Sequence, residues 1–186
     1  MKSIPLDKNT LFSVLLAVVV FAIINRVIPP SVSPVFDVVI SKNRTGIASI
    51  HQARDIELSK TVKVDLINLS EKSRFRHPKL GEIGYSNDFF ADITKSFTVK
   101  RAGDYVFHLG TDDGFTFSID GKQLCEFAAD RPLTIDSCNV NLSAGEHTFK
   151  LSYFQGSGNA GLTMTYAFAS DGEQYLAGDD SKYIYF

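Results

Sequence analysis

Hydrophobic and polar residues follow two different patterns in this chain of 186 residues. Near the N-terminus, residues 11–24 form one uncharged and almost entirely apolar run. From residue 35 onwards, apolar and polar positions alternate in short segments, which is the period of a strand with one buried face. Turn sequences rich in glycine separate these segments. The pattern therefore predicts an N-terminal helix followed by an all-β domain over residues 35–186.

The N-terminal run is long enough to cross a membrane when it is extended to residue 28. Eighteen helical residues, 11–28, span about 27 Å, which nearly matches the hydrocarbon core of a bilayer. Pro29 and Pro30 then end the helix. We therefore predict a tail over residues 1–10, a single transmembrane helix over residues 11–28 and a linker over residues 29–34.

A cleaved signal peptide and a buried core helix are the alternatives for this run. A signal peptide needs a cleavage site after its apolar region, but Ala22 lies inside the run and the small residues before Pro34 would be cleaved poorly. No polar face interrupts the run, which disfavours a core helix. Lys2 and Lys8 precede it, so the tail is expected to be cytoplasmic. The β domain is then predicted to lie outside the cytoplasm, in a periplasm or at the cell surface.

Eight segments of the remaining chain alternate well enough to be predicted as strands. The turn Asp120-Gly121 suits a hairpin because glycine accepts a positive φ without steric cost. Short strands with turns between them indicate a β-sandwich or a barrel. The predicted strands are residues 35–40, 61–69, 95–100, 105–109, 115–119, 140–142, 147–154 and 162–168.

The net charge gives no reason to expect nucleic acid as a partner, but one short segment is locally basic. The formal net charge is −2, so nothing in the total favours nucleic acid as a partner. Four basic or histidine side chains gather within residues 71–78. A solvated loop is the favoured interpretation of this stretch, and a patch for an anionic partner is the alternative. The four residues are Lys72, Arg74, Arg76 and His77.

The chain has two cysteines, Cys125 and Cys138. In an oxidising compartment such a pair closes one loop as a disulfide, and the predicted export of the domain favours that interpretation. Two buried free thiols are the alternative.

Asp112 and Asp113 are the strongest candidates for a site. They are adjacent carboxylates, they precede Gly114, and they stand between two predicted strands. Carboxylates at such a turn can bind a ligand, or they can cap local backbone amides and simply make the turn. Both interpretations are kept.

The order of several short motifs resembles the protective-antigen domain family, a β-sandwich found in flocculin-type adhesins, bacterial adhesins and glycosidase insertions. The resemblance covers about residues 97–166, whereas residues 31–90 match poorly. Each motif alone is weak, and their order and spacing are more specific. The motifs are Ala102–Phe107, Thr111–Gly114, Ile119–Lys122, Leu142–His147 and Gly158–Leu162.

The resemblance implies a calcium-dependent sugar site at the aspartates. In the adhesins the two aspartates are joined by a cis peptide and hold a calcium ion, which contacts sugar hydroxyls. Asp112 and Asp113 match that pair as metal ligands, and the loop from Gln155 to Asn159 is expected to add oxygens. Calcium takes six to eight oxygen ligands, so two carboxylates alone are not enough. The adhesins place an asparagine where this chain has Gln155, and the chain lacks tryptophan as a sugar platform.

No arrangement of residues predicts catalysis. The four histidines are scattered without metal-ligand spacing, and His108 and His147 are expected on strand faces. Residues 156–158, Gly-Ser-Gly, lack the strand and helix context of a phosphate loop or a nucleophile elbow. Adjacent carboxylates also differ from a glycosidase pair, whose members face each other across a cleft. The chain is therefore predicted not to be an enzyme.

Together these observations predict a membrane-anchored, extracytoplasmic module that binds glycans, with calcium as a possible cofactor. Its ligand-binding residues are predicted to be Asp112, Asp113, Gln155 and Asn159. The alternative is a non-catalytic accessory subunit that docks onto other subunits of a membrane complex. An exposed polar pocket around the aspartates would favour the first function.

Overall fold

The computed structural model describes residues 7–27 and 32–186 of the chain. Two compact units are present, a helical one and a β unit that begins at Val32. The first six residues of the predicted tail, the last residue of the predicted span and residues 29–31 of the predicted linker lie outside the described residues.

The helical unit contains α1 (Lys8–Val27). Asp7 caps its first turn, because its Oδ1 accepts a hydrogen bond of 2.7 Å from the N–H of Thr10. The large apolar side chains from Leu11 to Ile24 are exposed around the whole helix. Within residues 7–27 and 32–186, no helix combines the length and the apolarity needed to cross a membrane.

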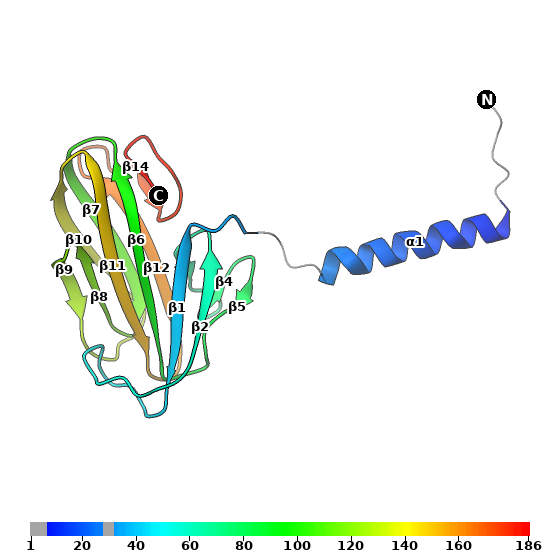
Figure 1. Cartoon of the computed structure of the whole chain (residues 1–186), viewed down its shortest axis with the longest axis horizontal. Helices are drawn as coiled ribbons and strands as arrows, with labels where there is room; N and C mark the ends of the chain where they lie inside the picture. Colours follow the sequence, from blue (N-terminus) through cyan, green and yellow to red (C-terminus); the bar gives the residue numbers. More distant parts are fainter. Residues whose placement is uncertain (1–6, 28–31) are drawn as a thin grey trace. The chain divides into compact units, whose positions relative to one another are not determined.

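The β unit is a sandwich of two antiparallel sheets, as the alternation predicts (Figure 1). A further hairpin joins β4 (Arg76–His77) to β5 (Gly81–Glu82). The seven-stranded sheet contains β1 (Phe36–Asn43), β2 (Ile56–Val64), β6 (Phe89–Val99), β8 (Phe115–Ile119), β9 (Lys122–Phe127), β11 (Gly145–Gln155) and β14 (Ile184–Tyr185). The five-stranded sheet contains β3 (Asn68–Leu69), β7 (Gly103–Asp112), β10 (Thr134–Leu142), β12 (Gly161–Phe168) and β13 (Gln174–Leu176).

Aromatic rings fill the space between the two sheets. Phe107 of β7 meets Phe117 of β8 with ring centroids 5.4 Å apart, and Phe117 lies 5.9 Å from Phe149 of β11. All three side chains are fully buried. Such tilted contacts between phenylalanines add to the free energy gained by burying their area. The core therefore explains why the chain is rich in phenylalanine.

The predicted strand bounds are least accurate at the edges of the sheets. The bounds of the strand predicted over residues 61–69 are wrong at both ends, because β2 begins at Ile56 and ends at Val64. Residues 56–61 of this edge strand are exposed on both faces, so they carry no alternation that a pattern could detect. The sequence also fails to predict β9 and most of β10, whose outward side chains are polar or exposed.

The prediction of a solvated loop over residues 71–78 is wrong for His77. Its side chain is buried, and its Nδ1 accepts hydrogen bonds from the N–H groups of Lys79 and Leu80. The other ring nitrogen, Nε2, therefore carries the proton and donates a hydrogen bond of 2.8 Å to Asp65 Oδ1. His77 ties the β4–β5 hairpin to the strand end at Asp65.

His147 lies on β11, as the pattern predicts, and both of its ring nitrogens face oxygen atoms. Nδ1 is 2.6 Å from Asp120 Oδ2, and Nε2 is 3.0 Å from the carbonyl oxygen of Ser143. Burial lowers the pKa of His147, but the bonds to Asp120 and Ser143 outweigh burial and raise the pKa above its ordinary value. Because Nε2 donates to a carbonyl, it has no lone pair with which to activate the Ser143 hydroxyl.

We expect His147→Gln to remove a pH-dependent part of the stability, worth up to about 1 kcal/mol. The raised pKa means that this contribution is fully present below the ordinary pKa of 6.5 and is lost as pH rises through the folded-state value. Thermal unfolding at about pH 6 and about pH 9 measures it. His108→Gln, on an exposed strand face, is the control and should keep the wild-type pH dependence; equal pH dependence in His147→Gln would contradict the assignment.

Candidate functional site

The candidate site lies where β7 turns into β8, at Asp112-Asp113-Gly114, which we call the acidic corner. The peptide bond between the two aspartates is cis, as the resemblance implies. Glycine is required at residue 114, because a Cβ there would lie 2.5 Å from the carbonyl oxygen of Phe127 and 2.6 Å from the ring of Phe154. The corner is therefore packed closely against the end of β9 and the end of β11.

Asp112 faces a hollow of about 340 Å³, which we call the corner hollow. Its Oδ2 accepts a hydrogen bond of 3.1 Å from the N–H of Leu133. Burial raises the pKa of Asp112, and the carboxylate of Asp130 adds to the shift. The other residues that line the hollow are Ser70, Ser73, Pro132, Leu133, Asn159 and Ala160.

Asp113 does not line the corner hollow and instead holds two loops together. Its Oδ2 accepts a hydrogen bond of 2.7 Å from the N–H of Gly156, and its Oδ1 lies 3.4 Å from the N–H of Arg131. Burial raises the pKa of Asp113 to about 7, and the neighbouring Asp130 carboxylate contributes to the rise. Asp113 thus joins the loop after β9 to the loop after β11.

Gln155 is buried and shapes the loop that follows β11. Its Oε1 accepts a hydrogen bond of 2.7 Å from the Tyr153 hydroxyl. Its Nε2 donates to the carbonyl oxygens of Ser157, at 3.1 Å, and Asn159, at 2.7 Å. Of the four residues predicted to bind a ligand, Asp112 and Asn159 therefore line one hollow, whereas Asp113 and Gln155 are buried and do not line it.

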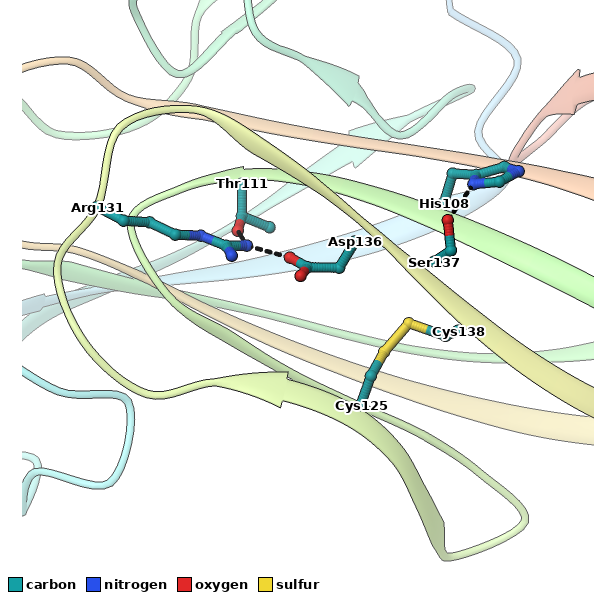
Figure 2. Close-up of a disulfide and its surroundings, with 7 residues drawn as sticks. All are labelled: His108, Thr111, Cys125, Arg131, Asp136, Ser137 and Cys138. Atoms are coloured by element: carbon teal, nitrogen blue, oxygen red, sulfur yellow. Dashed lines mark hydrogen bonds and ion pairs between the residues drawn. A yellow bond between two sulfur atoms is a disulfide. The ribbon is translucent and has the colours of Figure 1, made fainter.

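Arg131 binds Thr111, the residue before the acidic corner, and the sequence pattern did not indicate it. Figure 2 shows its guanidinium reaching toward Thr111 and Asp136. One terminal nitrogen, Nη2, donates to Thr111 Oγ1 at 2.7 Å and also to Asp136 Oδ2. The guanidinium carbon lies 4.2 Å from the centre of the Phe127 ring, and only 9% of the side chain is exposed. An arginine in a loop gives no periodic signal, so its burial could not be read from the pattern.

A disulfide closes the segment that carries Arg131 and Leu133. Cys125 of β9 is bonded to Cys138 of β10, as predicted (Figure 2). The bond joins an edge of the seven-stranded sheet to an edge of the five-stranded sheet. The N–H groups of Arg131 and Leu133, which donate to the aspartates, lie between the two cysteines. The disulfide therefore restrains the loop that carries these groups.

The carboxylates of the corner fit a calcium ion in the kind of donor but do not complete a site for it. Burial raises the pKa of Asp113 to about 7, and the neighbouring carboxylate of Asp130 adds to the rise; a divalent cation beside these carboxylates would favour their charged forms. The side-chain oxygen of Gln155, however, already accepts a hydrogen bond from Tyr153. Among the residues that the structure describes, no group of three or more acidic, histidine or cysteine side chains could hold a metal ion.

Comparison with solved structures shows the same fold in proteins of distant sequence. An anti-sigma factor domain-containing protein matches with a TM-score of 0.59 and 16% identity over 77% of this chain, which covers 46% of that protein. The PA14 sugar-binding domain from an RTX adhesin matches with a TM-score of 0.52 and 14% identity, over 76% of this chain and 94% of that domain.

A third solved structure is the Epithelial Adhesin 6 A domain from Candida glabrata, in complex with Galβ1-3GlcNAc. It matches with a TM-score of 0.56 and 14% identity, over 83% of this chain and 88% of that domain. At these identities the likeness concerns the fold alone.

Sequence comparison identifies the family directly. The comparison with curated proteins found no match. A family model, however, matches residues 81–181, which include both aspartates, both cysteines and the loop from Gln155 to Asn159. This stretch contains the acidic corner, Arg131 and the disulfide, whereas Ser70 and Ser73 of the corner hollow precede it. The chain belongs to the PA14 domain family.

Proposed function

We propose that the β unit is a carbohydrate-binding module and that the corner hollow binds the hydroxyl groups of a sugar. The observation that supports this most is the shared lining of the hollow by Asp112, Asn159, Ser70 and Ser73. A carboxylate accepts two hydroxyl hydrogens, an amide both donates and accepts, and serine hydroxyls do the same. Such convergent polar groups match the vicinal hydroxyls of a pyranose.

Relatives with the same fold support this class of ligand. One solved structure is described as a PA14 sugar-binding domain, and the Epithelial Adhesin 6 A domain was solved in complex with Galβ1-3GlcNAc. In this chain the apolar contact comes from an aliphatic side chain. Among the residues that line the corner hollow none is aromatic, whereas Leu133 is 53% exposed at its rim. Leu133 can pack against the C–H face of a sugar ring.

Calcium is proposed as an auxiliary ligand of the same corner, held by Asp112 and Asp113. When bound, it would supply a positive charge that attracts sugar hydroxyl oxygens. The remaining oxygens that calcium requires would then come from water and from the sugar itself. Calorimetric titration with millimolar calcium tests this: no heat of binding, and equal sugar affinity with and without a chelator, would exclude it.

We further propose that the module works outside the cytoplasm and that α1 anchors it to a membrane. The disulfide supports an oxidising compartment. The exposed apolar side chains of α1, with no polar face among them, support insertion into lipid. Detergent-dependent extraction of the full chain from membranes is the expected result, and recovery in the aqueous fraction would contradict the anchor.

We expect Asp112→Asn to weaken sugar binding by about tenfold or more, because hydrogen bonds to a charged acceptor contribute about 1.5–3 kcal/mol each. Glycan-array screening followed by calorimetry measures the loss. Asp104→Asn is the matched control, since Asp104 is an exposed aspartate at the other end of the same strand. Its variant should bind like the wild type, and both variants should unfold at about the wild-type temperature.

Two results would contradict the proposed function. One is the absence of any bound glycan on the array. The other is an Asp112→Asn variant that binds as well as the wild type and merely melts at a lower temperature. Either result would leave the corner as a turn element and favour the accessory-subunit alternative.

A further inference from the structure

The strand β2 forms one edge of the seven-stranded sheet and pairs on one side only, with β1 (Figure 1). Within the part of the chain that the structure describes, residues 57–63 make no backbone hydrogen bonds except those to β1. Alternate N–H and C=O groups of an edge strand point away from its neighbour. β2 therefore presents a row of donors and acceptors with which another strand can pair.

The side chains of β2 are accessible to such a strand. Residues 56–61 are exposed in succession, and the exposed fractions of Ile56 and Leu58 are 38% and 57%. The edge strand β10 differs, because the disulfide at Cys138 joins it to β9. Exposed apolar side chains on a long, uncovered edge strand favour pairing with another chain.

The register with β1 determines which face of the sheet each side chain of β2 occupies. Val62 lies opposite the buried Val38, so the even-numbered side chains of β2 lie on the core side. The odd-numbered side chains lie on the outer face, where Lys63 Nζ is 2.7 Å from Asp37 Oδ1. A strand added at this edge would continue both faces, because residues opposite each other in a sheet share a face.

Two copies of β2 are complementary when they pair antiparallel across a two-fold axis at Lys60. Each cross-strand pair then occurs twice and combines opposite charges, two aliphatic groups or two hydroxyl groups. Such pairs stabilise antiparallel strands. The pairs are Glu57 with Lys63, Leu58 with Val62 and Ser59 with Thr61, each joining one copy to the other.

The complementarity is specific to this axis. Moving the axis by one residue, to Ser59 or Thr61, would place Lys60 opposite an aliphatic side chain. It would also separate Glu57 from Lys63. A two-fold interface uses the same surface on both copies, so it requires a strand that is complementary to itself.

We propose that β2 is a homodimer interface at which a second copy of this chain pairs edge to edge and continues the seven-stranded sheet. The charge pattern identifies the partner as a second copy, because Glu57 and Lys63 have opposite charges and lie at equal distances along the strand from Lys60. The interface is independent of the corner hollow, which lies on other elements.

Lys60 weakens this dimer and makes it reversible. The two copies of Lys60 lie opposite each other at the axis, and like charges in such a pair are destabilising. Lys60 Nζ lies 4.7 Å from the centre of the Tyr85 ring of its own chain, which holds each ammonium group to one side. We therefore expect association to depend on protein concentration and Lys60→Thr to strengthen it about threefold to fivefold.

Charge reversal followed by mixing tests the register. Glu57→Lys places two lysines opposite each other at both ends of the interface, and Lys63→Glu places two glutamates there. Each variant alone should dimerise about tenfold more weakly than the wild type. An equimolar mixture should recover wild-type association, because every lysine of one variant then faces a glutamate of the other. Sedimentation velocity of the full chain in a mild detergent, at several protein concentrations, measures the association.

Lys122→Glu is the matched control, because Lys122 is an exposed lysine on β9, at the opposite edge of the same sheet. It should dimerise like the wild type. Equal association of all variants would point to α1 as the contact and overturn the proposal. A wild type that stays monomeric at every concentration would also overturn it, as would two reversed variants that do not associate when mixed. These results leave the proposed function intact, because it depends on the corner hollow alone.

Discussion

Arg131→Met is expected to destabilise the β-sandwich by about 2–3 kcal/mol. Asp136 would lose its partner while 34% of its side chain remains exposed, so the cost is lower than for a fully buried pair. Thr111 Oγ1 would lose the same donor. The free energy of unfolding in urea measures the change. The loop over the acidic corner should also become mobile, and sugar binding should weaken with it.

A double variant separates the ion pair from the shape of the side chain. Arg131→Met together with Asp136→Leu removes both charges, and we expect it to recover most of the lost stability. Arg54→Met is the matched control, because Arg54 also pairs with an aspartate, Asp92, and lies over an aromatic ring. That arginine is 35% exposed, so its loss should cost less than about 1 kcal/mol.

Equal losses of unfolding free energy in Arg131→Met and Arg54→Met would show that burial does not increase the contribution of Arg131 to stability. A double variant no more stable than Arg131→Met alone would show that the unpaired Asp136 was not the source of the loss. Either result would remove Arg131 as a support of the corner.

The sequence predicts the fold well where a strand has one buried face. β7 buries Tyr105, Phe107 and Leu109, β8 buries Phe115, Phe117 and Ile119, and both strands appear where the pattern places them. The edge strands do not alternate in this way. β2 is exposed on both faces over residues 56–61, so burial does not select its side chains and its bounds could not be predicted.

The candidate site could also be predicted only in part from the sequence. The resemblance to the adhesin domains implied that the aspartates and the loop from Gln155 to Asn159 form one site, and Asp112 and Asn159 do line one hollow. The direction of a side chain could not be predicted. The side chains of Asp113 and Gln155 bind backbone groups of the loop after β11 instead of lining the hollow. The burial of Arg131 depends on a contact with Thr111, which is far away in sequence, and it has no local pattern.

Removing the disulfide is expected to have the largest effect on stability, a loss on the order of 3 kcal/mol. Cys125 and Cys138 are 13 residues apart, and in the chain-entropy model a closed loop of this length restricts the unfolded state by about that amount. For a domain of this size the melting temperature should fall by about 6–12 °C. Cys138 is buried, so alanine is the suitable replacement at both positions.

The effect should also reach the proposed sugar site, because the loop closed by the disulfide carries the N–H groups of Arg131 and Leu133 that donate hydrogen bonds to the aspartates. Without the disulfide, the loop between residues 125 and 138 is more mobile and must be ordered when a sugar binds. The affinity for the sugar should therefore fall together with the stability of the domain. Wild type treated with a reductant should melt like the double alanine variant, whereas the variant itself should not respond to the reductant. Two free thiols in wild-type protein purified without reductant, or a variant that melts with the oxidised wild type, would contradict both the cross-link and the oxidising compartment that it supports.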